Sequence, residues 1–555
     1  MRSILVGLSL ATTTLFVSAT GRAATLLVTN DNDSGPGSLR AAITAANQAG
    51  GANTIDMSGL NGAVTLDSPL PVLANELTIV GPVAQPIFVG PLQGGGTKFR
   101  VFTIGPNANV SISGIYVGFG EDVTGLGGGG VYVDAGATLN LSNSKVANNV
   151  ASFGGGIFAV TGSTLRLENC NVQDNASSNG AGGGILAKGT FTVERSRITS
   201  NTAPTGGGIE VQGSGSMTDT VVSENHGTSG SGIHVDVQGS LECVRCTISK
   251  NDGGFAARAD DGTLSIVGST LSGNIGVAAI YLLGKSASFT SEGSTIVADG
   301  AGTKAFVIQG DPTTAGAVAS VRNTILAGTG PLCSVLGFAT LTSLGHNLAQ
   351  DATCKLGLAS DKPGVDPMLG PLADNGGPTQ THALLTGSPA IDSGDNTDAP
   401  TTDQRGYARI YNTTVDIGAF EVQPAPIVDA GADAADGDAG AEAGASDGGP
   451  HVDGGPHVDA GSRVDAGLPV PPPSGADAPE ADGGGTPGGS EGGSDGGCSA
   501  SATSSAPTAW LGSAFALAFA LVAVRRRSVR RLRRERARGI ERRSPTRDAH
   551  YERMK

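Results

Sequence analysis

The stretch GGGIFAVTGSTLRLENCNVQDN, residues 154–175, is followed by a variant of itself, GGGILAKGTFTVERSRITSN, at residues 182–201. Both contain a glycine cluster, an aliphatic residue, a short segment of alternating polarity, a small residue and a closing asparagine. The closing asparagine recurs at Asn149, Asn175, Asn201, Asn225, Asn251 and Asn274, in steps of 26, 26, 24, 26 and 23 residues. Self-similarity at a fixed period is the signature of a repeat protein.

A repeat of about 25 residues with several short strands predicts a chain that returns on itself once per repeat. Successive coils would stack about 4.8 Å apart, the usual distance between neighbouring strands. The closing asparagines would form a ladder in which each side-chain amide bonds to the next. An inward aliphatic column keeps the same period at Val146, Val172, Ile198, Val222, Ile248, Leu271, Ile296 and Ile325. We therefore predict an all-β fold, a right-handed parallel β-helix; helical and leucine-rich solenoids are excluded because no helix pattern accompanies the strands.

Composition and charge agree with this fold class. Glycine accounts for 88 of the 555 residues and aromatic residues for only 4%, which suits a turn-rich solenoid better than a helical enzyme core. The net charge of -15 argues against nucleic acid as a partner.

The N-terminus has the pattern of a secretory signal peptide over residues 1–23, with a basic start, an apolar segment and a small-x-small site. Residues 24–60 are predicted to form a cap, in which a helix begins after Ser38 and ends near Ala49. The cap would cover the open first coil of a β-helix spanning residues 61–330. Asp31 and Asp33 resemble a calcium loop only loosely, and a plain turn is the favoured interpretation.

After Leu332 the repeat is no longer visible, and residues 331–422 contain four distinctive phrases. These are DNGGPTQTHAL at 374–384, GSPAID at 387–392, TDQRG at 402–406 and DIGAFE at 416–421. They resemble the C-terminal signature of bacterial surface proteins of the choice-of-anchor Q family. The phrase NDSGPGSLRAAI at 32–43 is similar to CSLREA-type relatives, and the repeats resemble those of polymorphic outer-membrane proteins. The resemblance implies a β-helical surface protein, in a group whose members mostly lack an assigned reaction.

The last part of the chain resembles a surface-sorting tail. Residues 423–497 are an acidic Ala/Gly/Asp/Pro linker predicted to be a disordered stalk. In residues 498–534, Cys498 precedes an apolar run at 506–524 and a cluster of arginines, which the positive-inside rule places in the cytoplasm. Residues 535–555 form a basic tail. The arrangement resembles the MYXO-CTERM tail, which implies a Gram-negative, myxobacterial cell-surface or outer-membrane protein processed by a sorting protease near Cys498. An unprocessed single-span membrane anchor is the alternative.

The remaining cysteines predict one disulfide. Cys333 and Cys354 enclose a loop of suitable length. Cys170 and Cys246 occupy the same column three coils apart, roughly 14 Å, which is too far for a bond. Pairing of Cys243 with Cys246 stays open, because it requires a corner between them. No cysteine has the further ligands that a zinc site needs, so we predict no metal there.

Acidic residues on one strand face suggest the sharpest catalytic hypothesis. Glu168 and Glu194 occupy equivalent outward positions in adjacent coils, so their side chains should stack about 5 Å apart, near the separation found in retaining glycosidases. The neighbouring residues Arg166, Arg195 and Arg197 would instead neutralise a solvated surface. Asp260 and Asp261 resemble the paired acids of polygalacturonases, but the other phrases of that family are absent. The only tryptophan, Trp510, lies in the apolar run and offers no sugar-stacking platform.

These observations predict an exported, surface-anchored β-helix that acts as an adhesion or interaction scaffold for a surface or matrix glycan or protein. A polysaccharide lyase or glycoside hydrolase acting on the β-helix face is one alternative. A calcium-stabilised structural protein is another, motivated by Asp392, Asp395, Asp403 and Asp416. No other cofactor is predicted, and the sequence does not name a ligand.

Overall fold

The structure, a computed structural model, describes residues 23–300, 302–313 and 316–423. The predicted signal segment up to residue 22, the linker, Cys498, the apolar run and the basic tail lie outside the described residues. Within the described part of the chain, no helix is long and apolar enough to cross a membrane. The strands that the structure describes, their shared hydrophobic core and the disulfide lie within residues 23–423, so we expect this segment to fold on its own.

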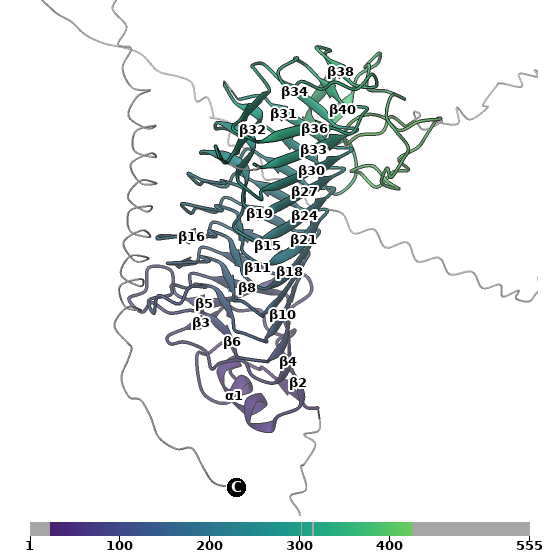
Figure 1. The fold of residues 1–555 in the computed structure, drawn as a ribbon. Coiled ribbons are helices and arrows are strands. Elements are labelled where there is room, and N and C mark those ends of the chain that lie inside the picture. Colours follow the sequence, from purple (N-terminus) through teal and green to yellow (C-terminus); the bar gives the residue numbers. More distant parts are fainter. Residues whose placement is uncertain (1–22, 301, 314–315, 424–555) are drawn as a thin grey trace, which may run out of the picture. The chain divides into compact units, whose positions relative to one another are not determined.

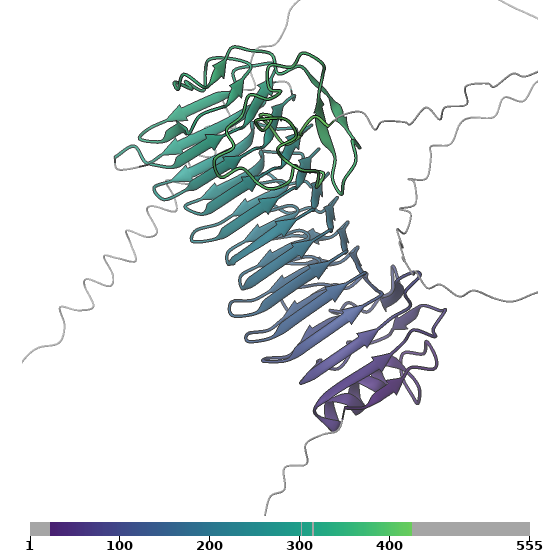
Figure 2. The same ribbon diagram turned by 90° about the vertical axis from the view of Figure 1, so that its right-hand side faces the viewer.

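The described chain forms the predicted right-handed parallel β-helix (Figure 1). Three parallel sheets, A, B and C, enclose one apolar core, and a regular coil contributes one strand to each. Sheet A contains β1 (Thr25–Leu27), β2 (Ala52–Asp56), β4 (Glu76–Val80), β7 (Asn109–Ser113), β10 (Thr138–Ser142), β14 (Thr164–Glu168), β18 (Thr190–Glu194), β21 (Ser214–Thr218), β24 (Ser240–Val244), β27 (Thr263–Val267), β30 (Ser288–Glu292), β33 (Val318–Arg322) and β36 (Thr340–Ser343). Figure 2 shows this sheet facing the viewer.

Sheets B and C complete the wall of the β-helix. Sheet B contains β3 (Val64–Leu66), β5 (Ile87–Pro91), β8 (Ile115–Gly118), β11 (Lys145–Ala147), β15 (Asn171–Gln173), β19 (Arg197–Thr199), β22 (Val221–Ser223), β25 (Thr247–Ser249), β28 (Thr270–Ser272), β31 (Thr295–Ala298), β34 (Ile325–Gly328), β37 (Leu348–Ala349) and β38 (Lys362–Pro363). Sheet C contains β6 (Phe102–Ile104), β9 (Val131–Val133), β13 (Ile157–Ala159), β17 (Ile185–Ala187), β20 (Ile209–Val211), β23 (Ile233–Val235), β26 (Phe255–Asp260), β29 (Ala278–Gly284), β32 (Lys304–Gly310) and β35 (Cys333–Leu336). From β10 to β30, the first residue of each sheet A strand pairs with the first residue of the next strand. The two residues are 23 to 26 positions apart in the sequence, which confirms the predicted period.

The asparagine ladder predicted from the repeat is present and buried. In each step the Nδ2 of one asparagine donates to the Oδ1 of the next, at 2.9 to 3.1 Å from Asn149 through to Asn274. The same Oδ1 also accepts the backbone N–H of the preceding asparagine. Glycine is required beside the ladder, since a Cβ on Gly156 would lie 2.7 Å from the carbonyl oxygen of Gly184 and 2.9 Å from Asn175.

A second ladder, which we did not predict, runs along the corner between sheets A and B. Here a small side chain accepts the backbone N–H of the equivalent residue one coil earlier, as when Cys170 N donates to Ser196 Oγ at 3.0 Å. The residue before it adopts a left-handed conformation, as at Asn169 and Arg195, with φ of 52° and 45°. Because left-handed φ costs about 1–2 kcal/mol outside glycine, the ladder stabilises a conformation that the chain would otherwise avoid.

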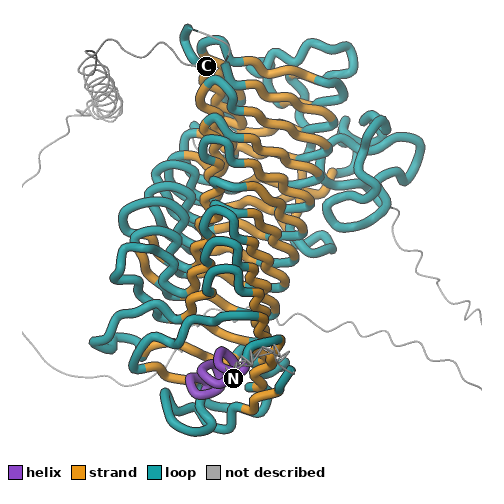
Figure 3. The backbone as a smooth tube through the Cα atoms, turned by 60° about the horizontal axis from the view of Figure 1, so that its bottom comes forward, coloured by secondary structure: helices purple, strands orange, loops and turns teal. Residues whose placement is uncertain are grey.

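The N-terminal end is covered by helix α1 (Leu39–Ala49), as the sequence predicts. Ser38 is the N-cap, and its Oγ accepts the N–H of Ala41 at 3.2 Å. Figure 3 shows the helix beside the first strands, where Leu39 and Ile43 are fully buried. Strands β1 and β2 also lie inside the predicted cap range and pair with sheet A, so the β-helix begins before residue 61.

The β-helix also continues past residue 330, where the repeat was predicted to stop. Strands β35, β36 and β37 pair with β32, β33 and β34 and form one further coil. The sequence hides this coil because Asn347 takes the place of the small residue in the second ladder, accepting Thr324 N at 3.0 Å. The predicted disulfide is present in this coil, with Cys333 and Cys354 bonded and their Cα atoms 4.8 Å apart.

The remainder of the described chain, residues 365–423, is here called the C-terminal region. It contains one antiparallel pair, β39 (Leu369–Ala373) with β40 (Thr381–Leu384). It packs on the outer face of sheet B in the last coils, where Thr247 Oγ1 donates to Gln380 O at 2.6 Å and Ala419 N donates to Thr295 Oγ1 at 3.0 Å. A further small pair, β12 (Val150–Ala151) with β16 (Ala176–Ser177), lies outside the three main sheets.

Candidate functional site: the outer face of sheet A

The outer face of sheet A carries a polar row along its whole length. In the twelve strands from β2 to β36 of this sheet, the third residue points outward, and register pairs it with its equivalent in the next coil. We call this the central row: Thr54, Thr78, Ser111, Asn140, Arg166, Thr192, Ser216, Glu242, Ser265, Thr290, Ser320 and Thr342. All twelve are exposed or half-buried, and nine carry a hydroxyl group. The face therefore offers a hydrogen-bonding group at each coil, about 4.8 Å from the next.

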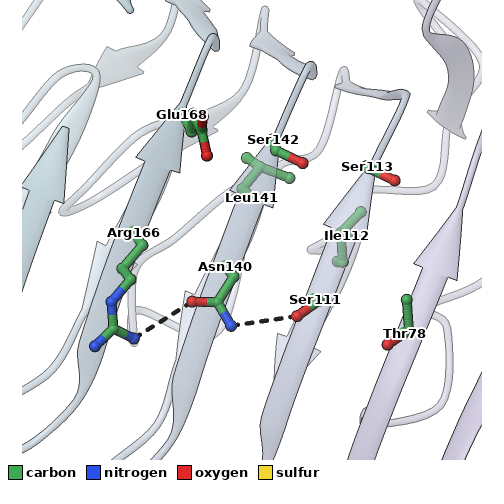
Figure 4. Close-up of a pocket in the computed structure, with 9 residues that line it drawn as sticks. All are labelled: Thr78, Ser111, Ile112, Ser113, Asn140, Leu141, Ser142, Arg166 and Glu168. Atoms are coloured by element: carbon green, nitrogen blue, oxygen red, sulfur yellow. Dashed lines mark hydrogen bonds between the residues drawn. The ribbon is translucent and has the colours of Figure 1, made fainter. Parts of the chain in front are cut away.

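A shallow cavity of about 240 Å³ lies over the N-terminal half of this row (Figure 4). Arg166 donates to Asn140 Oδ1 at 3.3 Å, and Asn140 Nδ2 donates to Ser111 Oγ at 3.2 Å. These side chains lie across three strands, and Thr78 and Glu168 also line the cavity. Hydroxyl, amide and guanidinium groups in one line can bind the hydroxyl or carboxylate groups of an extended ligand.

Glu168 and Glu194, the predicted catalytic candidates, are brought together but are not set up for catalysis. They are paired in register on β14 and β18, with side chains 59% and 50% exposed. Arg195 forms an ion pair with both, bonding Glu168 Oε1 and lying 3.5 Å from Glu194 Oε2. The general acid of a glycosidase lies in an apolar setting, whereas both of these side chains are at least half exposed and ion-paired with Arg195. The arrangement matches the alternative interpretation of a neutralised surface.

Buried and half-buried ionisable groups occur instead on the outer side of sheet C, and the sequence analysis named only one of them, Asp260. Glu210, His234 and Arg258 are paired in register on β20, β23 and β26. His234 Nδ1 lies 2.7 Å from Glu210 Oε2, and its Nε2 lies 3.5 Å from Asp260 Oδ2. Arg258 completes the group with two bonds to Asp260, at 2.7 and 2.6 Å. We call these four residues the sheet C cluster; no motif marks it, because its members come from three different repeats.

The charges within the sheet C cluster balance when His234 is protonated. Burial alone would lower the pKa of His234, but the carboxylates of Asp260 and Glu210 raise it to about 9. His234 is therefore charged at neutral pH and is unsuited to act as a general base. Asp261 points elsewhere and accepts the backbone N–H groups of Lys285 and Ser286 at 2.6 and 2.7 Å, so the Asp260/Asp261 pair does not form a shared acidic site.

The free cysteines do not form a reactive site. Cys170, Cys243 and Cys246 are unbonded and buried, so the predicted absence of a Cys170–Cys246 bond agrees with the structure. Burial raises the pKa of the Cys170 thiol to about 11. A hydrogen bond with Cys246, together with burial, raises the pKa of the Cys243 thiol well above its ordinary value. Thiols in this state are poor nucleophiles at neutral pH.

Two of the distinctive phrases attach the C-terminal region to sheet B and hold the region itself together. Gln404 is fully buried; its Oε1 accepts Thr270 Oγ1 at 2.6 Å, and its Nε2 donates to Cys246 O at 3.1 Å. Arg409 is also buried and donates to the carbonyl oxygens of Asp416 and Gly418, at 2.9 and 2.5 Å. These contacts give the TDQRG and DIGAFE phrases a structural role.

A second cavity of about 240 Å³ lies where the C-terminal region meets sheet B. There His382 Nε2 lies 2.8 Å from Ser272 Oγ, which in turn lies 3.2 Å from Asp299 Oδ2. This differs from a catalytic triad, because the aspartate contacts the serine rather than orienting the histidine. Ser272 is also buried, so these three side chains form an attachment contact.

The aspartates behind the calcium hypothesis do not converge. Asp392 accepts Asn412 Nδ2, and Asp395 accepts the N–H of Thr397 at 2.9 Å. Asp403 pairs with Arg405, while Asp416 accepts the N–H groups of Asp392 and Val422. In the portion of the chain covered by the structure, no group of three or more His, Cys, Asp or Glu side chains is arranged to hold a metal ion.

The fold and this open polar face define the class of the protein, a parallel β-helix. A family model described as "Right handed beta helix region" matches residues 101–225 and 129–296. No curated protein matches the chain in sequence. Among solved structures, the crystal structure of pectate lyase Pel9A is similar, with a TM-score of 0.37 and 12% identity, over 72% of this chain and 96% of that one. A similarity at this level carries no argument about activity.

Proposed function

We propose that this protein is an exported surface scaffold that binds an extended, hydroxyl-rich ligand such as a surface or matrix glycan along the outer face of sheet A, without turning it over. One observation carries the proposal: the central row of sheet A is exposed or half-buried in every coil, and the C-terminal region reaches this sheet only at its edge, where Arg322 Nη1 donates to Thr397 O at 3.1 Å. Sheet B is covered in its last coils by the C-terminal region, and the outward side chains at the centre of sheet C are buried.

The periodicity of the central row favours a polymer over a compact ligand. A polymer lying along the β-helix axis meets an equivalent hydrogen-bonding group at every coil, and each contact adds a small increment to the binding energy. The exposed, ion-paired state of Glu168 and Glu194 supports binding over catalysis.

The cellular setting is part of the same proposal. The signal-like N-terminus, the Cys333–Cys354 bond and the sorting-tail resemblance support display outside the cell, with a membrane anchor or sorting protease at the C-terminus. A chain that ends near Cys498 in fractionated cells supports sorting; a chain that retains its arginines supports the single-span anchor.

Binding is tested with residues 23–423 and a panel of neutral and acidic polysaccharides immobilised on a surface. The double substitution Asn140→Ala with Arg166→Ala removes the two hydrogen-bonded side chains that line the middle of the cavity and should weaken binding at least roughly tenfold. The matched control is Arg197→Ala, which removes an exposed arginine from sheet B in a nearby coil and should leave binding unchanged. Equal binding by the double variant and the unchanged protein contradicts the proposed face.

A further inference from the structure

The two ends of the β-helix are closed to different degrees. At the N-terminal end, α1 buries Leu39 and Ile43 against the core. At the C-terminal end the second ladder is terminated at the corner between sheets A and B, where Asp361 Oδ1 accepts Asn347 N at 3.1 Å. Among residues 23–300, 302–313 and 316–423, none closes the corner between sheets C and A in this way. Terminal coils of solenoid proteins need a polar outer cap to stay monomeric in solution.

Apolar side chains of the last coil are left uncovered at this corner. Val335 is paired in register with Ile308, which is fully buried in the inward column of sheet C, yet Val335 is 39% exposed. It is exposed because no further coil lies over it. Leu336 and Phe338, which follow it in the chain, are 50% and 60% exposed. We call Val335, Leu336 and Phe338 the end patch.

Open strand edges border the end patch on both sides. Strand β35 is the last of sheet C and β36 the last of sheet A, so each pairs with a strand on one side only. The N–H groups of Thr340, the first residue of β36, and of Leu344, the residue after this strand, bond back to the preceding coil. Because the N–H and C=O groups of successive residues alternate in direction along a strand, those of Leu341 and Ser343 point away from the preceding coil. An apolar surface flanked by unpaired backbone groups is a template for pairing with another strand.

We infer that this end is an interface between two copies of the chain, which meet with their C-terminal ends together. Helix α1 blocks the core at the opposite end, so head-to-tail growth is excluded and the remaining symmetric solution is a two-fold, isologous dimer. A two-fold axis through the corner between sheets C and A places β36 of each copy antiparallel to β35 of the other, where the open edge of β35 offers partners to the free groups of Leu341 and Ser343. It also brings the two end patches together and removes them from water.

The segment that follows in this chain is a poorer occupant. Residues 424–497 are rich in Asp, Gly, Ala and Pro, and have none of the alternating apolar pattern of an added strand. Their carboxylates would face the apolar side chains of the end patch, at a desolvation cost. A second copy offers matching apolar side chains and matching strand edges.

The test combines sedimentation with X-ray scattering on residues 23–423. We expect a concentration-dependent dimer with a maximum dimension roughly twice that of the monomer, as end-to-end contact requires. Leu336→Lys and Phe338→Lys should each raise the dimer dissociation constant at least roughly tenfold. Both side chains are at least half exposed, so the folded monomer should persist, which circular dichroism checks. The matched control is Leu126→Lys, 57% exposed near the other end, with no effect expected.

Three outcomes overturn the inference: a monomer at every concentration, a dimer no longer than the monomer, or equal weakening by the control. A chain extended to residue 497 provides the last arm. If it is monomeric while residues 23–423 form a dimer, the acidic linker occupies the end patch, and the two-copy interface is wrong. If residues 23–423 and the chain extended to residue 497 both form end-to-end dimers, a second copy of the chain occupies the end patch, as inferred.

Discussion

Replacing Asn201 with alanine tests the asparagine ladder at its middle step. Asn201 is fully buried; its Oδ1 accepts the backbone N–H and the Nδ2 of Asn175, both at 3.0 Å. Its Nδ2 donates to Val172 O at 2.9 Å and to Asn225 Oδ1 at 3.0 Å. Alanine removes all four bonds and leaves two N–H groups of Asn175, the backbone N–H and one of the two on Nδ2, without a partner inside the core, while the other N–H of Nδ2 keeps its bond to Val146 O.

The size of the effect follows from the unpaired donors. An unsatisfied buried donor costs about 1–3 kcal/mol, so two of them predict a loss of about 2–6 kcal/mol in the free energy of unfolding, before any cavity term. Asn201→Asp keeps the accepting oxygen but turns the donor into a charged acceptor facing Val172 O and Asn225 Oδ1. We therefore expect it to destabilise the fold at least as much as alanine.

Urea unfolding of residues 23–423, followed by circular dichroism, measures both changes. The matched control is Asn171→Ala, an asparagine on the outward side of β15, for which we expect a change within about 0.5 kcal/mol. A loss below about 1 kcal/mol for Asn201→Ala would refute the ladder as a main source of stability. An equal loss for Asn171→Ala would show that the effect is not specific to the ladder.

Two further predictions concern the sheet C cluster and the disulfide. The pKa of His234 rises from 6.5 to about 9 on folding, so its contribution, of about 3 kcal/mol at most, is complete below pH 6.5 and is lost as pH rises through about 9. His234→Gln should flatten this part of the stability–pH curve. An unchanged slope would show that His234 is not the source of this pH dependence. Replacing Cys333 and Cys354 together with serine opens a loop with a sequence separation of 21 and should cost about 3 kcal/mol, measured by thermal unfolding; a change below about 1 kcal/mol contradicts that estimate.

The fold was predictable because each coil repeats the same physical requirements. Asparagine must recur where its side-chain amide can hydrogen-bond to the equivalent asparagine in the next coil. Glycine must recur where a Cβ would clash with a carbonyl oxygen of the neighbouring coil. The predicted limits of the β-helix were less accurate. The first strands are interrupted by α1, and the last coil replaces the usual small residue with Asn347, so neither end shows the regular spacing.

The polar face was only partly predictable. Alternation in the strands indicated that Glu168 and Glu194 point outward and stack, and register bears this out. The sheet C cluster was missed because Glu210 and His234 sit 24 residues apart, at positions held by aromatic or aliphatic residues such as Phe158 and Leu186 in earlier coils. A charged residue in a column that other coils fill with apolar side chains is a signal that a comparison of equivalent positions across the repeats could have detected.

The most direct test of the proposed function measures binding and turnover in the same sample. Residues 23–423 would be mixed with each polysaccharide that the protein retains, and the products analysed for shortened or unsaturated chains. We predict that the protein retains the polysaccharide and releases no product. Retention should be lost in the Asn140→Ala and Arg166→Ala double variant, and it should be unchanged in Glu168→Gln and in Glu194→Gln. Product formation that either glutamine substitution abolishes would contradict the scaffold account and establish an enzyme on this face.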